Sequence, residues 1–212
     1  MIKINEIFHS IQGESSFSGL RTVFVRTSGC NLRCTYCDTT YAYYNGEKKT
    51  LDEIVGSVLE FSAKHVCVTG GEPLLQPEVH TLLTLLCDKG LTVSLETSGG
   101  ISCSNVDRRV KKIIDVKTPD SGEGSSFCAD NLMFADMSTE FKFVICSEAD
   151  FDWSESFCLK NSLFEKSNVL YSPSFGKVDE QWLAKKIIEK KSSARLQLQL
   201  HKYIWSPHTR GV

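Results

Sequence analysis

Three cysteines, Cys30, Cys34 and Cys37, stand within eight positions and form the one cysteine cluster of the sequence. Thiolates bind zinc and iron, and three of them on one loop need a cationic centre to stay deprotonated. Structural zinc sites and iron–sulfur clusters usually take four protein ligands. Three cysteines on a four-iron cluster leave one iron open to an exogenous ligand. The number three therefore favours a four-iron cluster, with zinc as an alternative.

A fourth ligand for zinc is hard to find. The nearest candidates are His9, His65 and His80, and none stands at the spacing of a zinc finger. The other six cysteines are scattered along the chain. Because no export signal is present, we expect them to be reduced thiols rather than disulfides.

Composition and the N-terminus limit the classes of function. The first fourteen residues, MIKINEIFHSIQGE, alternate polar and apolar residues and lack the apolar stretch of a secretory signal. No apolar run approaches the ~20 residues needed to cross a bilayer. A formal net charge of −2 argues against a broad basic face. The sequence therefore predicts a cytoplasmic protein with no nucleic-acid or membrane partner.

The elements that must position the cysteines alternate between strands and helices. Apolar patterns predict strands at 2–8, 22–27, 66–69, 91–96, 112–116, 140–146, 169–171 and 195–200. Periodicity and capping residues predict helices at 50–64, from 77 to just before Gly90, at 148–160 and at 179–190. Such alternation predicts an α/β fold of parallel β/α units. A full barrel needs eight units, so we expect a partial (β/α)6-type barrel with an N-terminal strand extension, as one domain over residues 1–212.

Glycine, polar and cysteine residues follow successive predicted strands. They occur at 28–30, 70–73, 97–100, 117–119 and 172–174. In parallel β/α folds, ligands bind beyond the carboxyl ends of the strands. These residues are therefore expected to form the rim of a ligand site, with the cysteine cluster among them.

The spacing C-x-x-x-C-x-x-C, with Tyr36 just before the last cysteine, resembles the signature of the radical S-adenosylmethionine enzymes. The stretch Gly70–Pro73, at the end of a predicted strand, is similar to the GGEP motif of that superfamily. Glycine lets backbone approach a ligand closely. The resemblance implies a [4Fe-4S] cluster whose open iron binds the amino and carboxylate groups of S-adenosylmethionine.

Further stretches narrow the resemblance to the 7-carboxy-7-deazaguanine synthases. They are 7–14 (IFHSIQGE), 37–39 (CDT), 96–99 (ETSG), 199–205 (QLHKYIW) and 210–212 (RGV). The IQGE stretch and the cysteine loop are shared with some glycyl-radical activating enzymes, which remain the alternative. The resemblance implies the ring contraction of 6-carboxy-5,6,7,8-tetrahydropterin to 7-carboxy-7-deazaguanine, on the route to queuosine, with loss of ammonia. A 5′-deoxyadenosyl radical takes hydrogen from C6 of the pterin, and S-adenosylmethionine is regenerated. It also implies Mg²⁺, a flavodoxin- or ferredoxin-type electron donor and a homodimer.

Carried over residue by residue, the resemblance assigns a role to each matching position. Cys30, Cys34 and Cys37 hold the cluster, and Thr39 is the Mg²⁺ ligand, a task that suits a hard hydroxyl oxygen. The S-adenosylmethionine pocket is lined by Tyr36, Asp38, Gly71, Glu72, Gly99, Lys117 and Ser172. The substrate is bound by Ile11, Gln12, Gly13, Arg26 and Thr97, with His201 and the carboxylate of Val212 as further contacts. Arg26 suits a substrate carboxylate because its fork binds such a group bidentately.

Two stretches depart from the family pattern. Ser15 stands where the family has the last glycine of IQGEG, and a serine there is strained if the position requires a positive φ. The stretch 115–130 also differs from the typical one. We therefore expect differences in the loop after Gly13 and at the adenosyl end of the pocket.

Overall fold

The computed structural model describes residues 1–207 and 209–212. Within them, nine strands form one sheet in the order β3-β1-β2-β4-β5-β6-β7-β8-β9. The strands are β1 (Ile2–Ile11), β2 (Arg21–Thr27), β3 (Glu47–Lys49), β4 (His65–Gly70), β5 (Thr92–Thr97), β6 (Lys111–Asp115), β7 (Thr139–Ile145), β8 (Asn168–Pro173) and β9 (Arg195–Leu196). From β2 to β9 all neighbours are parallel, whereas β1 pairs antiparallel with both β2 and β3. This confirms the partial barrel with an N-terminal extension.

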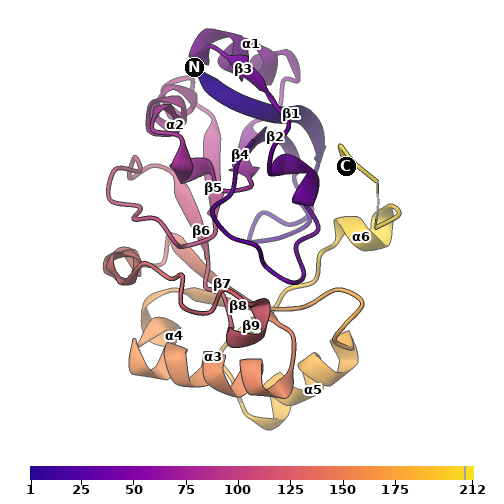
Figure 1. The fold of residues 1–212 in the computed structure, drawn as a ribbon. Coiled ribbons are helices and arrows are strands. Elements are labelled where there is room, and N and C mark those ends of the chain that lie inside the picture. The colour runs from indigo at the N-terminus through magenta and orange to yellow at the C-terminus, as the bar shows by residue number, and fades with distance from the viewer. Residues whose placement is uncertain (208) are drawn as a thin grey trace.

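Most of the helices cover the outer face of the curved sheet, and the last of them lies apart, near the C-terminus (Figure 1). The helices are α1 (Leu51–Glu60), α2 (Glu78–Asp88), α3 (Glu148–Lys160), α4 (Leu163–Lys166), α5 (Glu180–Glu189) and α6 (His201–Ile204). The predicted capping box is present, because Thr50 accepts from the Glu53 amide and Glu53 accepts from the Thr50 amide. Ser147 caps α3 and Asp179 caps α5 in the same way, each by accepting from a backbone amide of the first turn.

Strand β7 shows how the sheet separates core from site. Phe141 and Phe143 are fully buried, and Phe143 packs against the ring of Tyr171 at 5.7 Å between centroids. Glu140 and Lys142 alternate with them and therefore point to the opposite, concave face. The apolar residues build the core with the helices, whereas Lys142 lines the cavity and Glu140 accepts from the Ser16 amide.

The predicted boundaries are wrong at several places. Helix α1 ends at Glu60 rather than near residue 64. Two residues after its end, Ser62 adopts a positive φ of 52°, which a continuing helix does not allow. Strand β9 covers two residues instead of 195–200. The chain leaves β8 there because the Leu200 amide bonds to the Gly13 carbonyl at 2.9 Å. Strand β3 and the short helices α4 and α6 were not predicted, since three or four residues carry too little periodicity.

Candidate active site

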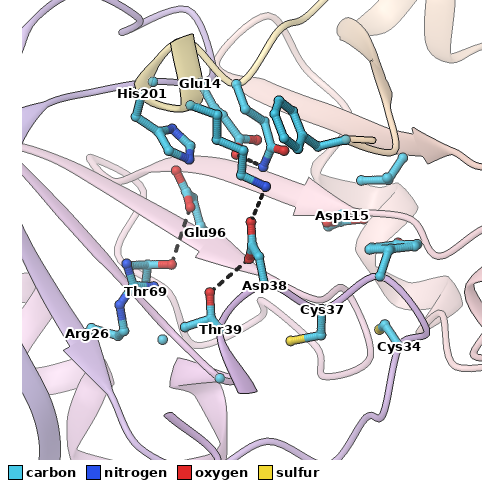
Figure 2. A pocket seen from close by; sticks show the side chains of 18 of the residues that line it. Glu14, Arg26, Cys34, Cys37, Asp38, Thr39, Thr69, Glu96, Asp115 and His201 are labelled. Carbon is cyan, nitrogen blue, oxygen red and sulfur yellow. Dashed lines mark hydrogen bonds and ion pairs between the residues drawn. The ribbon is translucent and has the colours of Figure 1, made fainter. Parts of the chain in front are cut away.

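A cavity of about 960 Å³ opens at the carboxyl ends of the parallel strands. Figure 2 shows it from close by, with side chains converging from the cysteine loop, from β2, β4, β5 and β6, and from the C-terminal segment. All residues that the resemblance assigns to ligands line this cavity except Glu72 and Gly99. The fold thus brings together residues 11–13 and 201, which lie at opposite ends of the sequence.

The cysteine loop follows β2 and forms one wall of the cavity. Cys30, Cys34 and Cys37 are free, half-buried and face the cavity. Burial raises the pKa of Cys34 to about 11, so its thiolate form needs a cationic centre. Within the described residues, no three His, Cys, Asp or Glu side chains are placed to share one metal ion. Each cysteine of an iron–sulfur cluster binds its own iron, so the three thiols of this loop are a donor set that fits such a cluster.

The turn after β4 packs directly under this loop. A Cβ atom on Gly71 would lie 2.2 Å from the carbonyl oxygen of Gly29 and 2.8 Å from Cβ of Cys30. The Glu72 amide also donates to the Gly29 carbonyl at 2.8 Å. Only glycine allows this approach. The ends of β2 and β4 therefore fix the position of Cys30 jointly.

Glu72 is fully buried and does not line the cavity. Its carboxylate accepts from the Thr97 hydroxyl at 2.9 Å, and from the Ser98 amide and hydroxyl at 2.7 and 2.5 Å. The Leu74 amide donates to it at 2.9 Å. In this structure Glu72 fixes the turn after β5, and its predicted place in the S-adenosylmethionine pocket stays a prediction. Gly99 has a φ of 73° and packs against the Asp115 carbonyl, behind the cavity wall.

A network of buried charges lies at the floor of the cavity. Lys142 contacts Glu14 at 2.8 Å and Asp115 at 3.5 Å, and Lys117 contacts Asp115 at 2.9 Å. Burial acts most strongly on Glu14 and would raise its pKa, but Lys142, Gln199 and His201 together lower that pKa overall. The sequence reasoning missed Lys142 and Glu14. A lysine at an inward position of β7, between two phenylalanines, was the signal that could have found it.

Several buried polar atoms along the cavity wall lack a partner within the described residues. They are the Tyr36 hydroxyl, Asp115 Oδ1 and the Ser174 hydroxyl. Buried polar groups are rarely left unpaired in native structures. These atoms therefore suit a polar ligand that enters the cavity beside the cysteine loop, as S-adenosylmethionine would.

Arg26 and Glu96 face the other half of the cavity (Figure 2). Glu6 lies opposite Arg26 in the β1–β2 ladder and accepts from its Nε at 2.7 Å. Glu96 accepts from the Thr69 hydroxyl and from the Gln12 amide, both at 3.2 Å. Burial raises the pKa of Glu96, and the nearby Glu14 adds to the effect. This half of the cavity offers both a cationic fork and a carboxyl group.

The C-terminal segment closes the cavity from the far side. Lys202 contacts Asp38 at 2.6 Å, and Asp38 accepts from the Thr39 hydroxyl at 2.9 Å. Loss of solvation acts to raise the pKa of Asp38, but the Lys202 ammonium, with the Thr39 hydroxyl, lowers it to about 2. A Cβ atom on Gly13 would collide with the ring of His201. Glycine at that position is therefore required for α6 to dock.

The two departing stretches can now be placed. Ser15 has a φ of 65°, which confirms that this position requires a positive φ and that serine is strained there. The strain costs about 1–2 kcal/mol, and the loop is held by the Ser16 amide, which donates to Glu140 at 3.1 Å.

In the 115–130 stretch, the Ser121 carbonyl accepts from the Thr35 amide at 2.9 Å, which ties that stretch to the cysteine loop.

Comparison with known proteins agrees with this geometry. A model of the Radical SAM superfamily matches residues 24–120. Over its whole length the chain is 47% identical to the 7-carboxy-7-deazaguanine synthase of Chlorobaculum tepidum, of which it covers 97%. It is 42% identical to the 7-carboxy-7-deazaguanine synthase of Koribacter versatilis, and the alignment covers all of both chains.

Solved structures support the fold. QueE from Escherichia coli superposes with a TM-score of 0.78 at 21% identity, covering 94% of each chain. SuiB from Streptococcus suis, bound to precursor peptide SuiA, gives a TM-score of 0.58 at 12% identity, over 82% of this chain and 47% of SuiB.

In the described part of the chain, no helix has the length and apolar character needed to span a membrane.

Proposed function

The chain belongs to the 7-carboxy-7-deazaguanine synthases of the radical SAM superfamily, and from that premise we propose that it acts on 6-carboxy-5,6,7,8-tetrahydropterin. The reaction contracts the pterin ring, releases ammonia and yields 7-carboxy-7-deazaguanine for queuosine and related deazapurines. This makes the protein a carbon–nitrogen lyase, with residues 1–212 as one domain. The observation that carries the proposal is the single cavity that collects Cys30, Cys34, Cys37, Thr39 and Arg26.

Different residues around the cavity would bind the cofactors and the substrate. The three cysteines would hold the [4Fe-4S] cluster, and Tyr36, Asp115 and Ser174 offer unpaired polar atoms to S-adenosylmethionine. When bound, the cluster and S-adenosylmethionine supply the one-electron chemistry of the superfamily. The protein itself positions the reactants and excludes water.

Substrate binding is assigned to the half of the cavity opposite the cysteine loop. Arg26 would bind the pterin carboxylate, because Glu6 fixes its Nε and leaves the rest of the fork to a ligand. Thr39 would ligate Mg²⁺, since its proton is donated to Asp38 and its lone pairs are left for a cation. Ile11, Gln12, Gly13 and Thr97 complete the substrate wall, and His201 and Val212 approach it from the C-terminal side.

The wider setting of the enzyme is part of the same proposal. We expect a cytoplasmic homodimer that receives electrons from a flavodoxin- or ferredoxin-type donor. Neither a glycyl-radical activating enzyme nor a zinc-binding protein is favoured, because the full-length relatives carry the synthase name.

A turnover assay tests the proposal. Anaerobically reconstituted protein, with reductant, S-adenosylmethionine and the carboxypterin, should form a deazaguanine carboxylate, faster with Mg²⁺ than without it. S-adenosylmethionine should be recycled, so stoichiometric consumption contradicts the assignment. The reconstituted protein should be brown and hold about four irons per chain, whereas a colourless protein with one zinc would point to a structural metal site.

A further inference from the structure

A chain of polar contacts joins the C-terminal segment to the cysteine loop. Lys202 Nζ lies 2.6 Å from Asp38 Oδ2, and the other oxygen of that carboxylate accepts from Thr39 Oγ1 at 2.9 Å. In Figure 2 one dashed line joins Asp38 to Thr39, and a second leaves the Asp38 carboxylate on its other side. Lys202 stands in the stretch 199–205 that resembles the family, but the resemblance assigns no role to it and gives Asp38 a place only in the S-adenosylmethionine pocket.

Lys202 is held in place independently of Asp38. The segment that carries it is fixed at its start by the bond from the Leu200 amide to the Gly13 carbonyl, at 2.9 Å. At its end the Tyr203 hydroxyl donates to Glu180 at 2.5 Å. The Lys202 side chain is only 8% exposed and its Nζ lies 4.9 Å from the centre of the Phe175 ring. A lysine that is packed and anchored in this way is a fixed charge rather than a mobile surface group.

Asp38 is the movable partner of the pair. Its side chain is 47% exposed and faces the open cavity, so Lys202 is the contact that fixes its orientation. A hydroxyl has one proton and two lone pairs. When Thr39 donates that proton to Asp38, its lone pairs turn away from the carboxylate and are free to bind a cation.

We propose that Lys202 is a positioning residue for the divalent cation, acting through Asp38 to keep the Thr39 hydroxyl oriented as a neutral ligand. The inference rests on the proposed function, which places Mg²⁺ at Thr39. Without Lys202, the Asp38 carboxylate is free to rotate and no longer holds the Thr39 hydroxyl in this orientation. Partners of this kind typically change metal affinity by about 10- to 100-fold.

Metal affinity, rather than activity, is the direct readout. Mn²⁺ replaces Mg²⁺ as the probe, and free Mn²⁺ is counted by electron paramagnetic resonance. The protein carries its reconstituted cluster in the oxidised, silent state, with S-adenosylmethionine and fully oxidised 6-carboxypterin, which cannot turn over. All variants are compared at equal iron content.

A double-mutant cycle separates positioning from a general structural effect. Lys202→Met should raise the Kd for Mn²⁺ by about 10- to 100-fold, as should Asp38→Asn. The double variant should be no weaker than the weaker single variant, because both remove the same contact. Lys202→Arg should retain most of the affinity. Lys190→Met removes a lysine from an exposed pair with Asp152 at 4.0 Å and should leave the Kd unchanged.

Two results would overturn the inference. One is an unchanged Kd in Lys202→Met, and the other is a double variant in which the two losses multiply. Lys202→Gln replaces Lys202→Met if the latter does not hold the cluster. Thr39→Val distinguishes failure of the Lys202 inference from failure of the proposed function. If Thr39→Val also leaves the Kd for Mn²⁺ unchanged, the metal is not bound at Thr39. If only Thr39→Val weakens binding, the metal assignment stands and the role of Lys202 is rejected.

Discussion

The contact between Gly71 and the cysteine loop makes Gly71→Ala a demanding test of how the first cysteine is held. The added Cβ would lie 2.2 Å from the Gly29 carbonyl oxygen, whereas carbon and oxygen in contact stay about 3.3 Å apart. The loop must therefore move by about 1 Å. Overpacking of this kind costs about 1–3 kcal/mol. Loss of the bond from the Glu72 amide to Gly29 adds about 1 kcal/mol.

We expect Gly71→Ala to fold and to bind less iron, because the displacement falls on Cys30 rather than on the sheet. The measurements are iron per chain after anaerobic reconstitution and the Tm of the apoprotein. Gly56→Ala is the matched control, since Gly56 is exposed on α1 and none of the described residues comes within 4 Å of a Cβ there. Alanine should raise the Tm, by the equivalent of about 0.8–1 kcal/mol of helix propensity. Full iron content in Gly71→Ala would refute the reasoning.

Three further predictions concern substrate, metal and pH. Thr39→Ala should lower turnover much more than iron content, and an equal loss of both would count against a role in binding Mg²⁺. Arg26→Lys should raise the KM for the carboxypterin about tenfold or more, which is the cost of one charged hydrogen bond. The Kd for S-adenosylmethionine should stay constant, and a shift in both constants would place Arg26 elsewhere. His65, buried between Thr22 and Ser94, has its pKa lowered by burial to about 4. Its unfolded-state pKa is about 6.5, so stability is complete above pH 6.5 and falls as pH drops towards 4, by on the order of 2 kcal/mol at pH 5. His65→Gln should flatten this slope in denaturant titrations, and an unchanged slope would exclude His65 as its source.

The sequence predicted what depends on neighbours along the chain. Three cysteines within eight residues, and a turn of glycines after a strand, are local patterns that remain local in the structure. The alternation in 140–144 likewise predicted a strand, because its period is set by the strand geometry itself. Patterns along the chain were sufficient to predict the order of strands and helices, and that order predicted the partial barrel.

Pairings between distant segments could not be predicted in this way. Lys142 and Glu14 are 128 residues apart in sequence, and only the folded structure shows that they meet. The burial of Glu72 was missed for the same reason, since its partners Thr97 and Ser98 belong to the next unit. The turn of the chain at 197–200 was predicted as strand because its docking partner, Gly13, lies at the other end of the molecule.

The docking of α6 against Gly13 has a consequence for the order in which the protein forms during synthesis. Gln199 donates to Glu14 at 2.9 Å across 185 residues, and Lys202 meets Asp38 across a similar interval. Chains emerge from the ribosome from the N-terminus, so the residues that close the cavity are made long after the cysteine loop. The cavity beside the cysteine loop therefore cannot close until residues 199–202 have been made. The nascent enzyme passes through a stage in which its metal-binding loop is accessible, and the final turn of helix ends that stage.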